Sequence, residues 1–117
     1  MQEDPSPYIP LSAANLHILL SLAAEDRHGY GIMQEVARQS GGKYKLGPGT
    51  LYDNLRKMLD TGMVEETGKL APDDDPRRRY YRLSGFGKKV LKAEVARLES
   101  VIQHARLHLR PAPGDRS

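Results

Sequence analysis

The sequence predicts a mainly α-helical fold with one small β-hairpin. Apolar residues recur at helical spacing in four segments, which glycine- or proline-containing breaks separate. Two strand-like segments, residues 63–67 and 77–83, lie between the third and fourth helical segments. The fourth segment carries an apolar repeat of two residues per heptad that extends to residue 109.

Length and composition indicate a single small folded unit. The chain has 117 residues, 38% of them hydrophobic, and no apolar run long enough to span a membrane. The first residues lack the basic start and apolar core of a signal peptide. With no cysteine, neither disulfides nor thiolate metal sites are available. We therefore expect a cytoplasmic protein.

The first helix is predicted to begin after Ser12, which is placed to cap it, and to extend to about Glu25. It has too many apolar residues for one buried face, so we expect part of it to contact a partner chain. These residues are Leu16, Leu19, Leu20 and Ala23 on one stripe, with Ile18 and Leu22 beside it.

Two further helices are predicted, over residues 30–39 and from Pro48 to Gly62. Ser40-Gly41-Gly42 ends the earlier one, because glycine tolerates the left-handed conformation at a helix end. Proline suits the first turn of the later one. The core stripe of this helix is Leu51, Leu55 and Met58, and its opposite face carries Gly49, Asp53 and Arg56, flanked by Tyr52 and Lys57.

The hairpin and the last helix complete the predicted fold. Strand alternation places Tyr81 and Leu83 on one face and Arg78, Tyr80 and Arg82 on the other. Two strands alone are marginally stable, so the hairpin is expected to pack on helices. A long helix capped by Ser84 then follows. This order of elements predicts a winged helix-turn-helix with an added C-terminal helix.

The cationic residues are clustered along the chain. Between Lys43 and Lys92 there are 12 lysines and arginines against 7 acidic residues, whereas the remainder has 6 against 8. Such clustering is typical of a phosphate-binding surface, and a short helix beside a basic hairpin can hold a DNA major groove and the flanking backbone. We predict these DNA contacts: Lys43, Lys45, Gly49, Thr50, Tyr52, Asp53, Arg56, Lys57, Arg77, Arg78, Arg79 and Tyr80.

Other interpretations of these residues stay open. Asp73-Asp74-Asp75 could form salt bridges with the adjacent arginines, although exposed pairs contribute only about 0–1 kcal/mol. Tyr52 could pack on the hairpin, and Thr50 could serve only as a cap. Arg56 could belong to a solvated helix face.

The apolar repeat of the last helix predicts self-association. The seam is narrow, so we expect it to pack against the partner's first helix as well. A two-fold pair would require a pseudo-palindromic operator with half-sites about one DNA turn apart. The predicted dimerisation residues are Leu16, Leu19, Leu20, Leu91, Val95, Leu98, Ile102, Ala105 and Leu109.

Four short segments and one glycine lie in order along the chain: His28-Gly29-Tyr30-Gly31-Ile32, Gly49-Thr50-Leu51-Tyr52, Gly62-Met63-Val64, Tyr81-Arg82-Leu83-Ser84 and Gly87. Together they resemble the PadR-like transcriptional regulators, in the compact branch with one C-terminal helix. The resemblance covers roughly residues 15 to 100 and implies a homodimeric DNA-binding repressor of a nearby operon, in some cases released by a small ligand. It also implies a phosphate contact for Tyr52. Asp53 departs from the pattern, because many family members have proline there, so a family operator sequence cannot be carried over.

Sequence and resemblance together predict four parts in the chain. These are a mobile N-terminal arm (1–10), a DNA-binding winged helix-turn-helix (11–83), a dimerisation helix (84–109) and a disordered tail (110–117). We expect no enzyme activity, cofactor, metal or membrane partner, because no catalytic or ligand-binding spacing is present. A winged-helix adaptor that binds proteins is the alternative, and RNA binding is disfavoured by the shortage of aromatic residues for stacking.

Overall fold

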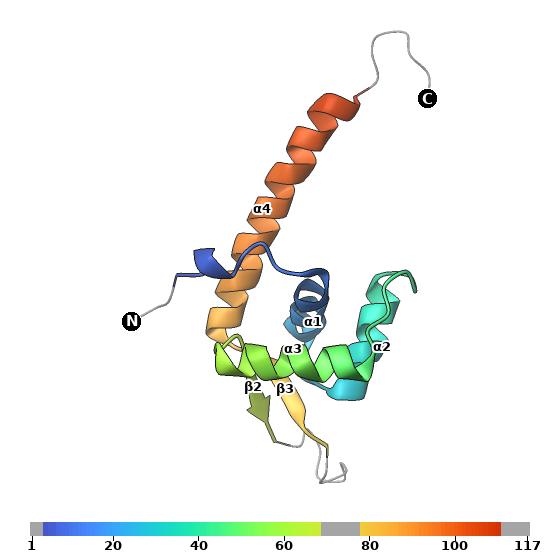
Figure 1. Ribbon diagram of the computed structural model, residues 1–117, viewed down its shortest axis with the longest axis vertical. Coiled ribbons are helices and arrows are strands. Elements are labelled where there is room, and N and C mark those ends of the chain that lie inside the picture. Colours follow the sequence, from blue (N-terminus) through green and yellow to red (C-terminus); the bar gives the residue numbers. More distant parts are fainter. Residues whose placement is uncertain (1–3, 69–77, 111–117) are drawn as a thin grey trace.

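The structure, a computed structural model, describes residues 4–68 and 78–110. In Figure 1 the long helix α4 projects from a body of shorter helices, and the strands lie at the opposite end of the molecule. The elements in chain order are η1 (Ser6–Tyr8), α1 (Ala13–Ala24), β1 (Arg27–His28), α2 (Gly29–Gln39), α3 (Pro48–Asp60), β2 (Val64–Thr67), β3 (Tyr80–Leu83) and α4 (Gly85–Leu109).

Helix α1 is central, and it contacts α2, α3, α4 and β3. Its predicted cap is confirmed, because Ser12 Oγ accepts the Asn15 N–H at 3.1 Å. After α2, Gly41 and Gly42 have φ of 63° and 79°, and after α3 Gly62 has φ of 82°, which is the left-handed conformation that glycine tolerates at a helix end. The buried core draws on α1 to α4 and on strands β2 and β3, and includes Ile18, Leu19, Leu22, Ile32, Val36, Leu46, Leu51, Leu55, Met58, Met63, Val64, Tyr81, Leu83, Val90 and Leu91.

The sheet has three antiparallel strands in the order β1-β3-β2, rather than the two strands that the sequence predicts. Strand β1 places Arg27 opposite Tyr81 and His28 opposite Tyr80, on the side of β3 that β2 leaves open. A two-residue strand is too short to show an alternating pattern, so no sequence signal distinguishes it from a loop. These three strands form the wing, and β1 joins it directly to the start of α2.

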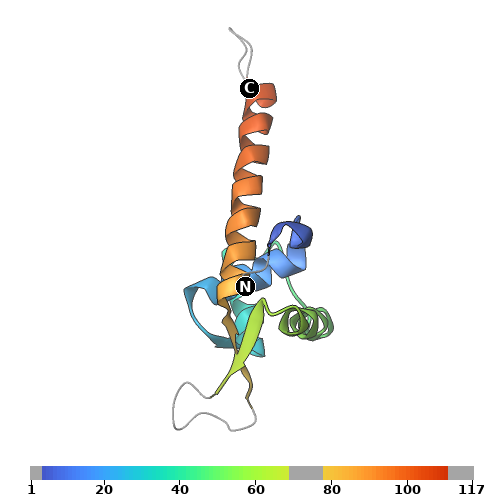
Figure 2. The same cartoon turned by 90° about the vertical axis from the view of Figure 1, so that its left-hand side faces the viewer.

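Helix α4 is fixed at its amino-terminal end. The Ser84 hydroxyl accepts the Gly87 N–H at 2.9 Å and donates to the Gly62 carbonyl, so one side chain joins α4 to the turn after α3. A Cβ at Gly87 would overlap the Met63 carbonyl oxygen, so only glycine allows this close approach. Residues 99–110 are all exposed, and two perpendicular views show no described element beside this part of α4 (Figures 1 and 2).

The described segment before α1, from residue 4, packs against α4, whereas the sequence predicts a mobile arm over residues 1–10, of which residues 1–3 lie outside the described residues. The Glu94 carboxylate, in a residue only 1% exposed, accepts the Leu11 N–H at 3.0 Å and two bonds from Arg97. Tyr8 meets Phe86 edge to face, with ring centroids 5.4 Å apart. The bonds from Arg97 and from Leu11 hold the pKa of Glu94 below its ordinary value, against the desolvation that raises it.

None of the helices in the described ranges combines the length and apolar character that crossing a membrane requires.

Candidate nucleic-acid interface

The exposed face of α3 carries the side chains that the sequence predicts for DNA contact. Pro48 lies in the first turn, and Leu51, Leu55 and Met58 are at most 1% exposed, which turns the opposite side of the helix outward. Thr50 makes no side-chain cap, because the N-cap residue is Gly47. The outward residues are Gly49, Thr50, Tyr52, Asp53, Arg56 and Lys57.

Tyr52 connects the start of α3 to the start of α2. Its side chain crosses Gly29, where a Cβ would overlap the phenol oxygen, and yet 45% of Tyr52 is exposed. The ring is therefore fixed by packing and still available to a ligand. Both interpretations of this residue, packing and ligand contact, are compatible with its position.

Asp53 lies within ion-pair distance of Arg56 on the same helix face. The carboxylate and guanidinium are 3.7 Å apart, and both side chains are more than two-thirds exposed. In such a solvated pair the charges are weakly coupled, so Arg56 stays available to a phosphate. The pair shows that Asp53 has a local partner in the free protein.

The loop before α3 exposes Lys43 and Lys45 and is fixed by the residues around them. Leu46 is buried in the core, and Tyr44 stacks on His17 of α1 with ring centroids 4.7 Å apart. Ser40 Oγ accepts the Tyr44 N–H and donates to its carbonyl. These contacts hold the two lysines at the edge of the helix-turn-helix.

The wing presents Arg78 and Arg79, both exposed. Arg79 forms an ion pair with Glu66 of β2 at 3.1 Å, and Arg82 bonds to Asp26 at 3.2 Å. Arg77 lies outside the described residues. Arg78 and Arg79 line the same cavity as Tyr52, so the wing and the start of α3 are adjacent.

Tyr80 is not on an exposed face, and the prediction of its outward position is wrong. The residue is 5% exposed, and its ring meets His28 edge to face at 5.3 Å. His28 of the added strand β1 is the cross-strand partner of Tyr80 and packs against it, whereas the predicted two-stranded hairpin has no residue at that place. The remaining exposed residues of the wing are the better candidates for DNA contact.

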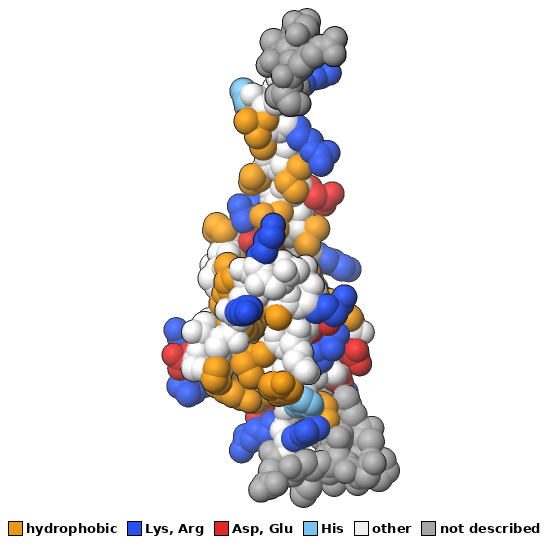
Figure 3. Space-filling model, turned by 90° about the vertical axis from the view of Figure 1, so that its right-hand side faces the viewer, with side chains coloured by type: hydrophobic (Ala, Val, Ile, Leu, Met, Phe, Trp, Pro, Cys, Tyr) orange, Lys and Arg blue, Asp and Glu red, His pale blue; other side chains and the backbone are white. Residues whose placement is uncertain are grey.

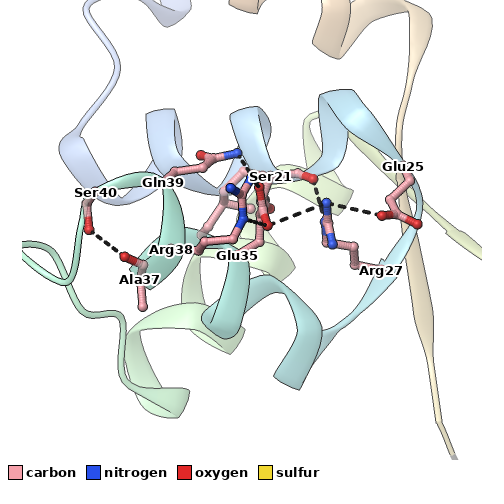
Figure 4. A network of polar contacts seen from close by, with 9 residues as sticks. Ser21, Glu25, Arg27, Glu35, Ala37, Arg38, Gln39 and Ser40 are labelled. Atoms are coloured by element: carbon pink, nitrogen blue, oxygen red, sulfur yellow. Dashed lines mark hydrogen bonds and ion pairs between the residues drawn. The ribbon is translucent and has the colours of Figure 1, made fainter.

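A polar network centred on the buried Glu35 joins the second half of α2 to β1 (Figure 4). Glu35 accepts bonds from Arg38 and Gln39, while Arg27 of β1 lies between Glu25 and Glu35. The Arg38 bond, followed by the Gln39 bond and the nearby Arg27 charge, lowers the pKa of Glu35 to about 2, although desolvation opposes the shift. The network fixes β1 against α2, so it positions the cavity wall.

The predicted dimerisation residues fall into two groups. Leu19 and Leu91 are 0% and 7% exposed within one protomer, so their assignment to a partner contact is wrong: they belong to the core of their own subunit. Val95 and Ile102 are 40% and 48% exposed, Leu109 is 79% exposed, and Leu16, Leu20 and Leu98 are half-buried. Figure 3 shows hydrophobic side chains recurring along the projecting helix between charged ones.

Several residues that shape the site lacked a sequence signal. Tyr81 was predicted only as an inward strand residue, yet it lines the cavity with Tyr52. Glu35 and Glu94 resemble ordinary surface acids in the sequence, and their burial depends on partners from neighbouring elements or from the next helical turn. The local indications were the spacings of Glu35 with Arg38 and of Glu94 with Arg97, each three residues apart on one helix.

The helix pair α2 and α3 and the three-stranded wing define this chain as a winged helix-turn-helix protein. A family model described as the transcriptional regulator PadR-like family matches residues 18–93. The chain therefore belongs to the PadR-like family of transcriptional regulators.

Individual relatives agree with this assignment. The transcriptional regulator Rv3488 of Mycobacterium tuberculosis is 31% identical over 90 residues, which span 77% of this chain and 79% of the relative. A PadR family regulator from Clostridium difficile superposes with a TM-score of 0.71 at 21% identity, over 84% of this chain and 99% of that one. Bacillus subtilis PadR, solved with operator DNA, gives a TM-score of 0.62 at 21% identity, over 74% of this chain and 48% of that one. These two structures share the fold.

Proposed function

We propose that the protein is a homodimeric repressor that binds a pseudo-palindromic operator near its own gene. The observation that carries the proposal is the adjacency of Tyr52, Arg78 and Arg79, which line one cavity. The start of α3 and the wing thus face the same way, as a domain must arrange them to hold a groove and the flanking backbone together. Bacillus subtilis PadR, which has the same fold, was solved with operator DNA.

The dimer in this proposal is supported by the exposed aliphatic residues of α4. Val95 and Ile102 lie on one stripe of a helix that has no other described element beside its far end. A soluble chain rarely leaves such a stripe uncovered. The half-buried Leu16 and Leu20 of α1 are the further candidates for the partner contact. Repression and release by a small ligand stay predictions from the family resemblance.

A salt series tests the DNA contact. The protein is titrated onto the intergenic fragment upstream of its own gene at increasing salt concentration. Wild-type affinity should fall steeply with salt, and Arg78→Ala should flatten the log–log slope by about one unit, because one phosphate contact is lost. Arg106→Ala, on the exposed far part of α4, is the matched control and should leave the slope unchanged.

The result also separates DNA binding from the protein-adaptor alternative. An adaptor would show neither salt-dependent affinity for the fragment nor a difference between Arg78→Ala and Arg106→Ala. An adaptor would also give no footprint on the same fragment. Absence of salt-dependent binding, or absence of a footprint, would contradict the proposed function.

A further inference from the structure

A polar cavity of about 330 Å³ lies between the start of α2, the start of α3 and the end of the wing. Tyr30 lines it from α2, Tyr52 from α3, and Arg78, Arg79 and Tyr81 from β3 and the residues before it. Phenol and guanidinium groups thus converge from three elements. All of these groups can donate hydrogen bonds.

Tyr81 is the distinctive residue of this cavity. The residue is only 5% exposed, yet it is one of the residues that line the cavity. A tyrosine on the wall of such a cavity combines a packed ring with a hydroxyl that can donate to a ligand atom. Burial, then the Glu66 carboxylate and Tyr52, raise the pKa of Tyr81 against the opposing charge of Arg79, so the hydroxyl remains protonated and able to donate.

The charges around the cavity favour an anion. Arg78 and Arg79 are exposed cations, and the amino-terminal end of α2, with its partial positive charge, begins at the cavity wall. Glu66 opposes them, since its carboxylate lies 3.1 Å from Arg79. That pair is exposed and therefore weak, so a phosphate can compete for Arg79.

We propose that this cavity holds one backbone phosphate of DNA, with the Tyr81 hydroxyl donating to a phosphate oxygen beside Tyr52 and Arg79. The proposal rests on the DNA binding proposed above and assigns it a specific contact. A DNA phosphodiester fits better than a free anion, because the lining groups come from the start of α3 and from the wing, the two elements that a winged helix applies to the duplex.

Tyr81→Phe tests the contact, because it removes one hydroxyl and keeps the ring. Hydrogen bonds to charged groups contribute about 1.5–3 kcal/mol, so the operator affinity should fall about tenfold or more. The salt slope should not change, because a neutral hydroxyl displaces no counterion, whereas Arg79→Ala should lower it by about one unit. Tyr8→Phe, a hydroxyl loss at the packed segment on α4, is the matched control and should bind as wild type does.

A duplex with single methylphosphonate substitutions locates the phosphate. A methylphosphonate at one position in each half-site should weaken the binding of wild type. The same substitution should reduce the affinity of Tyr81→Phe much less, because the hydroxyl that contacts this phosphate is already absent from the variant. Thermal unfolding of Tyr81→Phe by circular dichroism should match that of wild type.

The outcomes separate this contact from DNA binding itself. If wild type binds no DNA, the proposed function fails and the contact with it. If wild type binds and Tyr81→Phe binds equally well, or loses affinity at every methylphosphonate position alike, only the assigned contact is overturned. Binding of inorganic phosphate that requires Tyr81, without a position-specific methylphosphonate effect, would assign the cavity to a free anion and would also overturn it.

Discussion

A single carboxylate, Asp53, stands in a helix face that otherwise suits a polyanion. It lies 3.7 Å from Arg56, and both groups are exposed, so water screens the pair. On DNA the two groups would have different roles. Arginine can bind guanine or a phosphate, whereas a carboxylate can accept a hydrogen bond from a cytosine amino group and repels phosphate. Asp53 should therefore lower the affinity for most DNA sequences and favour those that place a cytosine amino group beside it.

Replacing Asp53 by asparagine should raise affinity for DNA outside the operator. We expect a gain of about two- to fivefold, because the repulsion is removed and the exposed Arg56 pair was worth no more than about 1 kcal/mol. Competition binding between operator and unrelated duplexes measures it. Asp60→Asn changes the net charge equally near the far end of α3 and is the control. Equal gains for both variants would show that only net charge matters.

At the scale of the element, the start of α4 is built on a backbone contact. Gly87→Ala should destabilise the fold by about 1–3 kcal/mol, because the added methyl overlaps the Met63 carbonyl and overpacking forces the helix away. Gly85→Ala lies in the same turn with nothing within 4 Å of a Cβ and should be neutral or slightly stabilising. Urea unfolding compares the two variants. Equal midpoints would contradict the close approach.

The Glu35 network predicts a pH dependence of stability. The pKa of Glu35 is about 2 in the folded chain against an ordinary 4.5, so the folded state holds the charged form more strongly than the unfolded chain does. Its contribution is therefore complete above about pH 4.5 and is lost as the pH falls toward 2.

Glu35→Gln removes this titration and should make the dependence measurable. The difference in unfolding free energy between wild type and variant should be constant from pH 7 to 5 and should shrink below pH 4.5. Urea unfolding at a series of pH values tests it, with Glu65→Gln on the exposed side of β2 as the control. A difference that stays constant down to pH 2.5 would show that Glu35 does not titrate as the network requires.

Elements with a local pattern were predictable from the sequence, and contacts between elements were not. Ser12 and Ser84 precede helices whose apolar spacing is regular, so caps and bounds could be inferred. Strand β1 has two residues and depends on β3 for its conformation. Because the sequence did not predict β1, it also placed Tyr80 on an exposed face. Alternation separates the two faces of a strand, but it does not say which neighbouring residues cover each face. Leu19 was assigned to a partner because apolarity predicts burial without naming the surface that buries it.

At the scale of the whole molecule, the surfaces proposed for DNA recognition and for subunit pairing are separated along the long axis. Strands β2 and β3 lie at one end of the structure, and α4, which carries the proposed pairing surface, extends toward the other (Figures 1 and 2). In a two-fold dimer the helices would meet along this surface while the two α3 helices stay free. The distance between half-sites would then be set by how the α4 helices cross.

Replacing both Leu98 and Ile102 by aspartate should separate the subunits, because two charges would be buried in the middle of the seam. Sedimentation should give a protomer of 13.1 kDa in place of a dimer. Operator affinity should fall by at least about 100-fold, since the half-sites would bind independently instead of as a linked pair. Leu107→Asp places the same charge at a residue that is 66% exposed and off this stripe, and it should stay dimeric. A double variant that remains folded and dimeric would show that subunits pair through another surface, and the predicted half-site spacing would no longer hold.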